Sequence, residues 1–139
     1  MSAEIPTSHK DLLERAIYTV LVTVMPDGQP QASIVWCKYD GAHIQVSTIR
    51  GRQKEKNMSA RPMATLLALD PQDPFRFLEI RGMVDEMTEE GGVELINELS
   101  MAYVNQQFYG GYTSAERAGQ EVRVVCKIKP KKVVAYPAG

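Results

Sequence analysis

The sequence has few of the residues that build covalent cross-links or metal centres. Only two of its 139 residues are cysteine and two are histidine. Cys37 and Cys126 each lie in an apolar or alternating stretch with no second cysteine nearby, so we predict buried thiols rather than a disulfide framework or a zinc site. We expect His43 to point outward from a strand and His9 to stand at a helix start, and neither is a good candidate for a general base.

Long apolar runs and a surplus of one charge are also missing. No stretch reaches the roughly 18 apolar residues that a membrane-spanning helix needs. The polar residues 1–16 do not resemble a secretion signal, so we expect a cytoplasmic protein. The net charge of -1 argues against a nucleic-acid-binding domain. An apolar content of 44% and a length of 139 residues suit one soluble domain, residues 1–139.

Turn signals and β-branched residues divide the first half of the chain into short elements. We predict a short helix at 9–16 and then strands at 17–25, 29–41 and 42–49. The tripeptide Pro26-Asp27-Gly28 and the dipeptide Asp40-Gly41 are typical of tight turns. Three strands joined by such turns would form an antiparallel meander.

The second half predicts further strands and two more helices. We expect a helix at 52–60 that ends before Pro62, a strand at 63–69 buried on both faces, a strand at 75–87, an amphipathic helix at 92–104, a surface loop at 106–120, and strands at 121–129 and 132–136. The predicted fold is mainly β: six or seven antiparallel strands in a small closed barrel, with helices filling its openings.

A basic segment follows the third predicted strand. Arg50, Arg52, Lys54 and Lys56 recur at every second position. In a helix they repel one another at i, i+4 spacing, and cations at a helix start oppose the helix dipole. An anionic ligand would convert this cost into a gain, and hydroxyls at 47–48 together with helix N–H groups could join the cations around one phosphate. A solvated basic face remains the alternative from these residues alone.

The segments "RQKEKN" and "DPQDPFRFLEIRG", in this order of elements, give the chain a recognisable pattern. The sequence resembles the flavin-reductase-like split-barrel superfamily that includes the pyridoxamine 5′-phosphate oxidases. It is most similar to the branch that uses the deazaflavin coenzyme F420. The resemblance implies an FMN-binding type of split barrel that forms a homodimer, with two cofactor sites at the subunit interface and a small-molecule substrate.

The resemblance also implies which residues bind the cofactor. Lys54 matches the lysine that holds the cofactor phosphate, and Arg52 a basic residue that helps it. The full set is Gln31, Val35, Trp36, Ser47, Thr48, Arg52, Gln53, Lys54, Phe75 and Phe77. Residues 31, 35 and 36 would border the ring, residues 47 and 48 would lie near the phosphate, and the two phenylalanines would reach the ring of the partner subunit.

The implied activity is hydride transfer from reduced F420 to an electron-poor small molecule. The cation row suits the phosphodiester and glutamate carboxylates of F420, whereas FMN offers a single phosphate. The family's Arg-Lys pair is Gln53-Lys54 here, and the substrate-binding C-terminal extension is missing, so pyridoxamine phosphate is not the expected substrate.

Three alternatives remain open on the sequence. They are an FMN-dependent oxidoreductase, a noncatalytic carrier of flavin or haem, and a small barrel that binds single-stranded RNA, which the net charge disfavours. Within the first reading, Tyr109 or Tyr112 is a hypothetical proton donor, and Gly110 and Gly111 would let their loop move as a lid.

Overall fold

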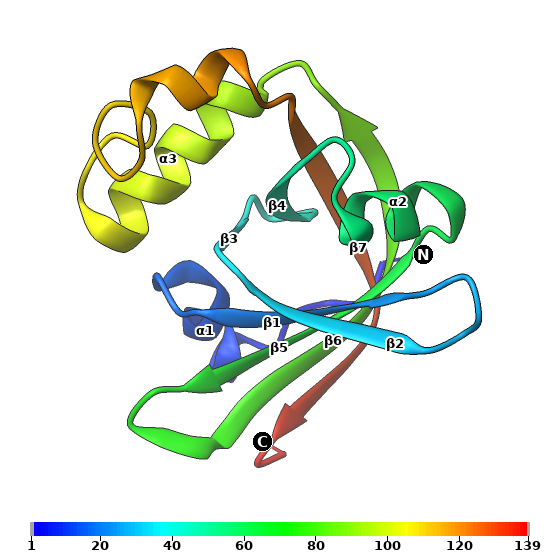
Figure 1. The fold of residues 1–139 in the computed structure, drawn as a ribbon. Helices are drawn as coiled ribbons and strands as arrows, with labels where there is room; N and C mark the ends of the chain where they lie inside the picture. Colours follow the sequence, from blue (N-terminus) through cyan, green and yellow to red (C-terminus); the bar gives the residue numbers. More distant parts are fainter. Residues whose placement is uncertain (1, 139) are drawn as a thin grey trace.

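The computed structural model describes residues 2–138, so the two ends of the predicted domain, residues 1 and 139, lie outside it. Its strands are β1 (Thr19–Val24), β2 (Pro30–Val35), β3 (Cys37–Tyr39), β4 (Ile44–Ile49), β5 (Met63–Asp70), β6 (Asp73–Thr88) and β7 (Arg123–Tyr136). Its helices are α1 (Asp11–Glu14), α2 (Gln53–Ala60) and α3 (Gly92–Val104), with 3-10 helices η1 (Thr7–His9) and η2 (Ala115–Gly119) (Figure 1).

All seven strands belong to one antiparallel sheet in the order β2-β1-β5-β6-β7-β4-β3. Its two edge strands, β2 and β3, are separated in the chain by Trp36 alone, so the sheet has to curl until its edges meet. No strand pairing joins these edges among the strands of residues 2–138. The mainly-β split barrel is therefore confirmed, and the fully closed barrel was wrong.

The single strand predicted at 29–41 is in fact two strands at opposite edges of the sheet. β2 pairs with β1 and β3 pairs with β4, which also replaces the predicted meander by two separate hairpins. The break falls at Trp36 because a side chain takes over the backbone hydrogen bonds there. The Cys37 N–H donates to the Tyr103 hydroxyl on α3 at 3.0 Å, and that hydroxyl has two carbonyl acceptors for its single proton, Ile17 at 2.9 Å and Cys37 at 3.1 Å.

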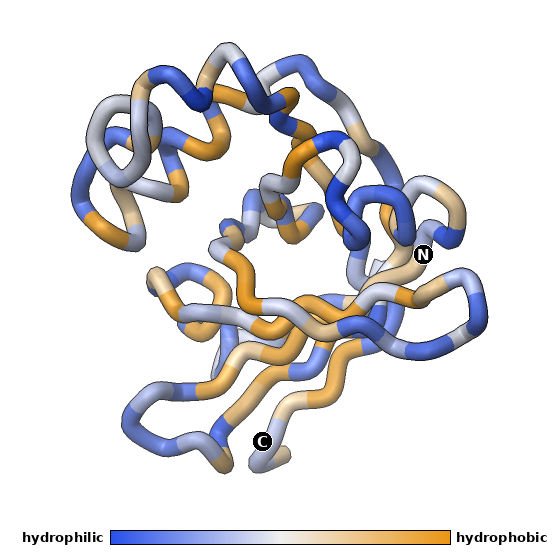
Figure 2. The backbone as a smooth tube through the Cα atoms, viewed as in Figure 1, coloured by the Kyte–Doolittle hydropathy of each residue, from blue (hydrophilic) through white to orange (hydrophobic). Residues whose placement is uncertain are grey.

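The core is formed by the inward face of each strand. Leu21, Leu66, Leu78, Ile80 and Ile128 are fully buried, and the strands that carry them are the hydrophobic parts of the tube in Figure 2. Burial of each such side chain stabilises the fold by about 1.5–3 kcal/mol. β5 was predicted to be buried on both faces, but its burial alternates: Ala64, Leu66 and Ala68 are buried, and the residues between them are partly exposed.

β7 is one strand, where two had been predicted. The ladder with β6 shifts register where Pro130 pairs with Gly82, so the proline, which has no N–H to donate, sits at a bulge. A Cβ at Gly82 would lie 2.5 Å from Cγ2 of Ile128, so only glycine fits this crossing. The bulge lets β7 continue through Pro130, although a proline normally ends a strand.

The helices at 53–60 and 92–104 are confirmed, while two other predicted elements need correction. The first helix is shorter than predicted and divided into η1 and α1, because the backbone turns extended at Arg15. The loop at 106–120 contains η2, which Ser114 caps by accepting a hydrogen bond from Glu116 N–H. In Figure 1, η2 lies beside α3, and both stand apart from α2.

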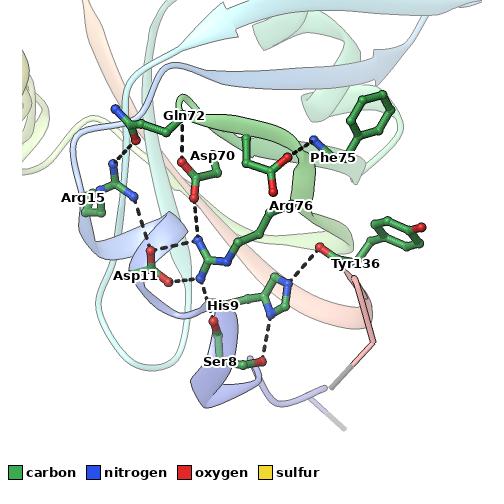
Figure 3. A network of polar contacts seen from close by, with 10 residues as sticks. Ser8, His9, Asp11, Arg15, Asp70, Gln72, Phe75, Arg76 and Tyr136 are labelled. Carbon is green, nitrogen blue, oxygen red and sulfur yellow. Dashed lines mark hydrogen bonds and ion pairs between the residues drawn. The ribbon is translucent and has the colours of Figure 1, made fainter.

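A polar network fixes the N-terminal helices against the β5–β6 turn (Figure 3). Arg76 donates to Asp11 at 2.6 Å, to Asp70 at 3.0 Å and to the Ser8 carbonyl at 2.7 Å. These bonds lower the pKa of Asp11, chiefly through the hydrogen bond from Arg76. His9 is buried next to this network and lies 3.0 Å from the Tyr136 carbonyl through Nε2. The network is structural and lies outside the pocket described below.

Candidate functional site

A pocket of about 450 Å³ opens between the β2–β3 corner, the end of β4, the start of α2, and the α3–η2 region. It is lined by Tyr18, Ile34, Val35, Trp36, Ser47, Thr48, Ile49, Arg52, Lys54, Leu99, Phe108, Tyr112, Arg117 and Arg123. Six of the residues implied by the family resemblance are in this list: Val35, Trp36, Ser47, Thr48, Arg52 and Lys54. The fold therefore brings together two segments that the sequence singled out separately.

Lys54 and Arg52 bring positive charge to the pocket from the start of α2. Neither side chain forms an ion pair or hydrogen bond within residues 2–138. Burial of the ammonium group, and the charge of Arg52 beside it, lower the pKa of Lys54 below its ordinary 10.5. No side chain caps α2 at Arg52, so the first N–H groups of the helix add to the positive potential. An anion bound here would stabilise the charged form of Lys54.

The predicted row of cations is shorter than expected. Arg50 is neutralised by Glu55 at 3.2 Å and Glu89 at 3.0 Å, and Glu55 also accepts from the Gly51 N–H. The guanidinium of Arg61 bonds the Val24 carbonyl at 2.8 Å and holds a turn. Lys56 is exposed and does not line the pocket. The repulsion inferred from the sequence is thus relieved at Arg50, and Arg52 and Lys54 are the cations of this segment that line the pocket.

Two hydroxyl groups at the end of β4 lie at the same place. Ser47 Oγ accepts a 3.4 Å contact from Arg123 Nη1. Thr48 is only 3% exposed, and its Oγ1 is the one buried side-chain polar atom in residues 2–138 without a hydrogen-bond partner. Such an orphaned group costs about 1–3 kcal/mol. A buried hydroxyl without a partner, in a pocket with an unneutralised lysine, indicates that the site is built for a ligand.

Aromatic rings form the opposite wall. The Trp36 ring stacks on Tyr103 with centroids 5.5 Å apart and meets the edge of Tyr112 at 5.2 Å. Phe108 stacks on Tyr112 at 5.7 Å. Trp36 therefore both packs against α3 and lines the pocket, which are the two roles that the sequence could not separate. A flat, apolar group would fit against this wall.

Gln31 and Gln53, two of the implied cofactor residues, do not line the pocket. Instead they contact Asn57, a fully buried residue of α2. The Asn57 amide also donates to Thr23 Oγ1 at 3.1 Å. These residues hold α2 against the β1–β2 hairpin. They therefore influence the site by positioning Lys54, which α2 carries, and they do not contact the pocket themselves.

Phe75 and Phe77 also lie outside the pocket of their own chain. Phe75 is 77% exposed at the β5–β6 turn, and the Phe77 ring stacks on Tyr136 at 5.5 Å. The exposure of Phe75 and the stacking of Phe77 do not test whether these rings reach a cofactor in a partner subunit. That role stays a prediction.

Arg117 and Arg123 are pocket residues that the sequence reasoning missed. Their only signal in the sequence is the alternation of 121–129, which places Arg123 on a different face from Val124. Arg123 is nearly buried, and its guanidinium carbon lies 4.6 Å from the centroid of Phe108. No sequence pattern places the η2 residue Arg117 there, because a loop with little periodicity carries it.

Of the two proposed proton donors, only Tyr112 lines the pocket. The Tyr109 hydroxyl donates to Glu121 at 2.8 Å and accepts from Arg123 Nε at 3.0 Å, and burial raises its pKa. Gly110 has a φ of +87°, and a Cβ at Gly111 would lie 2.3 Å from the Gln107 carbonyl oxygen. The two glycines therefore serve a tightly packed turn, and a lid motion stays a hypothesis.

The other groups considered in the sequence lie elsewhere. Both cysteines are buried, as predicted, and burial raises the pKa of the Cys126 thiol to about 12. His43 faces outward and lies 2.6 Å from Asp85. Residues 2–138 contain no group of three or more potential metal ligands from His, Cys, Asp and Glu. Within the same residues, the longest apolar helical stretch falls short of what a membrane crossing requires.

A curled seven-stranded antiparallel sheet with a basic, hydroxyl-lined pocket at its β4–α2 junction defines a split-barrel protein with one candidate ligand site there. The family model of pyridoxamine 5′-phosphate oxidase matches residues 5–136, and the chain belongs to this family. A comparison with curated protein sequences gives no match.

Solved structures support the same fold. An F420 reductase is 30% identical, covers 94% of this chain and 98% of its own, and has a TM-score of 0.82. A conserved hypothetical protein from Mycobacterium tuberculosis is 20% identical over 95% of this chain and 84% of its own, with a TM-score of 0.71. A putative pyridoxamine 5′-phosphate oxidase from Listeria innocua is 21% identical over 94% and 97%, with a TM-score of 0.67. The last two share the fold alone.

Proposed function

We propose that this protein is an F420-dependent oxidoreductase that reduces an electron-poor small molecule. The observation that carries the proposal is the meeting of Lys54, which has no acidic partner, with the unpartnered Thr48 hydroxyl in one pocket. The family and the 30% identical F420 reductase support a flavin or deazaflavin cofactor. When bound, the reduced coenzyme supplies a hydride to the acceptor.

The residues of the pocket fit the phosphodiester of such a coenzyme. Lys54 and Arg52 supply charge, and Thr48 and Ser47 supply hydroxyl donors at the end of β4. Charge-assisted hydrogen bonds of this kind are roughly twice as strong as neutral ones. A bound phosphate would satisfy the orphaned Thr48 hydroxyl and recover the cost of keeping Lys54 charged in a partly buried place.

The remaining pocket residues would orient the reacting groups. Trp36 and Tyr112 meet edge to face and offer an apolar aromatic wall that would hold a ring and exclude water. Two tyrosines, Tyr18 and Tyr112, line the pocket, and the Tyr112 hydroxyl is our candidate for passing a proton to the reduced acceptor. The chain supplies position and charge, while the two-electron chemistry belongs to the coenzyme.

We infer further that two copies complete the site. Ile34, Met63 and Phe75 are large apolar side chains left exposed on strands β2, β5 and β6. Exposed apolar groups of this size are typical of an interface, and an interface here would bring Phe75 and Phe77 toward the partner's pocket. The homodimer is a proposal that the mass of the protein in solution can test.

FMN is the second candidate cofactor, because the pocket cations of α2 would also hold a single phosphate. A titration with F420 and FMN side by side separates the two. Wild type should bind F420 more tightly than FMN, and Lys54→Ala should weaken F420 binding by about tenfold or more, the value of one charge-assisted contact.

Lys56→Ala is the matched control, since Lys56 is an exposed lysine on the same helix. It should bind F420 like wild type. Tight FMN binding without F420 binding would replace the first candidate by the second. Binding of F420 without reduction of any enone, quinone or nitro compound would favour a carrier.

A further inference from the structure

The pocket carries more positive charge than one phosphate requires. Besides Lys54 and Arg52 on the α2 side, it is lined by Arg117 from η2 and Arg123 from the start of β7. None of the acidic side chains of residues 2–138 lines it. The two pairs of cations therefore come from segments that are far apart in the chain, residues 52–54 and 117–123. We call Arg117 and Arg123 the arginine end.

The arginine end is only partly neutralised. Arg117 and Arg123 share one carboxylate, Glu121, which lies 3.3 Å from Arg123 Nη2 and also pairs with Arg117. Burial would raise the pKa of Glu121, but the hydrogen bonds from Tyr109 and Arg117 outweigh it, and the pKa is lowered. Two guanidinium groups against one ionised carboxylate leave one positive charge in excess.

Some of the Arg123 side-chain N–H groups form no hydrogen bond within residues 2–138. A guanidinium has five N–H groups. Arg123 uses one on Tyr109 at 3.0 Å, one on Glu121 at 3.3 Å, and one on Ser47 at a long 3.4 Å. The other two have no acceptor within residues 2–138. A carboxylate that enters the pocket could therefore bind Arg123 without displacing Glu121.

An apolar wall adjoins these donors. The guanidinium of Arg123 lies over the Phe108 ring, Phe108 stacks on Tyr112, and the edge of Trp36 meets both rings, at 6.2 and 5.2 Å. This arrangement places an aromatic, apolar wall directly beside a cation that has N–H donors without a partner. Its complement is a conjugated, apolar molecule that ends in a carboxylate.

We propose that the arginine end binds the carboxylate of the acceptor substrate, and that this acceptor is an α,β-unsaturated acid. The proposal rests on the proposed function, in which Lys54 and Arg52 are occupied by the coenzyme phosphate. Arginine suits the role because its planar fork matches a carboxylate with two parallel hydrogen bonds.

The same geometry would assist the reduction itself. When bound, the reduced coenzyme would give up a hydride, which would form a C–H bond at the β-carbon while the π electrons of the acceptor's double bond moved toward the carboxylate. Arg123 is placed to stabilise the charge that gathers there. A proton at the α-carbon, from the Tyr112 hydroxyl proposed above, would complete the saturated acid and leave the coenzyme oxidised by two electrons.

Binding of trans-cinnamate and its neutral isostere cinnamamide tests this site. Trp36 is the single tryptophan and lines the pocket, so its fluorescence reports binding with or without coenzyme. Wild type should bind cinnamate about tenfold more tightly than cinnamamide, the value of a charged hydrogen-bonded pair. Arg117→Met and Arg123→Lys should each remove most of that preference and leave cinnamamide binding unchanged.

Lys54→Ala separates the two proposals. It should weaken coenzyme binding by about tenfold or more, as above, and leave cinnamate affinity intact. The Arg117 side chain is 44% exposed, whereas that of Arg123 is nearly buried, so the Arg117 variant tests the site even if a change at Arg123 prevents folding. Equal binding of acid and amide, or a cinnamate affinity that depends on Lys54 and not on the arginines, would overturn the carboxylate site. A loss of F420 affinity in Arg117→Met and Arg123→Lys would also overturn it, because the arginine end would then bind the glutamate carboxylates of the coenzyme. Arginine-dependent cinnamate binding without any F420 or FMN binding would support the site and overturn the proposed coenzyme function.

Discussion

Asn57 Nδ2 lies 3.2 Å from Gln31 Oε1, which joins the helix that carries Lys54 to the strand that leads to Trp36. The same amide group donates to Thr23, and Asn57 Oδ1 accepts from Gln53 at 2.8 Å. Asn57 is completely buried, so its bonds are not exchanged with water. One side chain, that of Asn57, therefore fixes the position of the helix that carries Lys54 relative to the strand that leads to Trp36.

Replacement of this side chain should damage both the fold and the site. Asn57→Leu leaves several buried donors and acceptors without partners and should lower the free energy of unfolding by about 3 kcal/mol. Coenzyme affinity, measured well below the melting temperature, should also fall because Lys54 loses its fixed position. Met58→Leu, a similar-sized change at the next buried residue, should change neither the free energy of unfolding nor the coenzyme affinity appreciably. Wild-type coenzyme affinity in Asn57→Leu would show that the network does not position the site.

Coenzyme binding should depend on the protonation of Lys54. The pKa of Lys54 is lowered by burial and by Arg52, so the group loses its proton at a pH below 10.5. In the free protein, stability rises as pH increases from the lowered pKa toward 10.5, because the unfolded chain binds more protons there. Affinity for F420 should show the opposite trend and fall across the same range. Lys54→Arg should bind without this alkaline loss, and an identical pH profile in both proteins would contradict the role of Lys54.

The network around Arg76 should control stability in acid. The hydrogen bonds from Arg76 lower the pKa of Asp11. The pKa of Asp70 is lowered too, chiefly because the Gln72 N–H donates a hydrogen bond to its carboxylate. A carboxylate whose pKa is lowered by folding stabilises the fold at every pH above its unfolded pKa of 3.8. This stabilisation is lost as the pH falls from 3.8 through the lower pKa of the folded state. Arg76→Met should reduce the melting temperature at neutral pH and show a smaller further loss on acidification. Equal acid-induced losses in both proteins would refute this account.

Phe75 should matter more for assembly than for folding. Its side chain is 77% exposed in the single chain, so Phe75→Ser should hardly change the stability of a monomer. If the proposed dimer buries this ring, the variant should dissociate at higher protein concentration than wild type, as sedimentation equilibrium can measure. Met101→Ser, at an exposed apolar residue of α3, serves as the control. A wild-type protein that is monomeric at all concentrations would remove the partner role of Phe75.

Local patterns predicted the elements well where one residue type decides the structure. Gly51, with φ of +96°, precedes a helix that ends before Pro62, and the amphipathic spacing of 92–104 matches α3. The break at Trp36 could not be foreseen, because it depends on a hydroxyl 66 residues away in the chain, that of Tyr103. Strand order across the sheet depends on such distant contacts in the same way.

The site was predictable only in its contiguous part. The basic segment and the hydroxyls before it lie next to one another in the sequence, whereas Arg117 and Arg123 reach the pocket through the packing of η2 and the register of β7 against β4. Sequence reasoning also overcounted the free cations, because Glu89, the partner of Arg50, is 39 residues distant. Charge counted along the chain does not reveal which charges are neutralised in the fold.

Thr48→Val tests the central claim most directly. Valine keeps the shape of threonine and removes the unpartnered buried hydroxyl, so the protein without coenzyme should become more stable by about 1 kcal/mol, while its affinity for F420 falls severalfold. Thr23→Val, at a buried hydroxyl that has partners, should instead destabilise. Denaturation and F420 titration of the two variants give the answer. A Thr48→Val protein that is less stable, or that binds the coenzyme like wild type, would contradict the claim that this pocket is built to hold a phosphate.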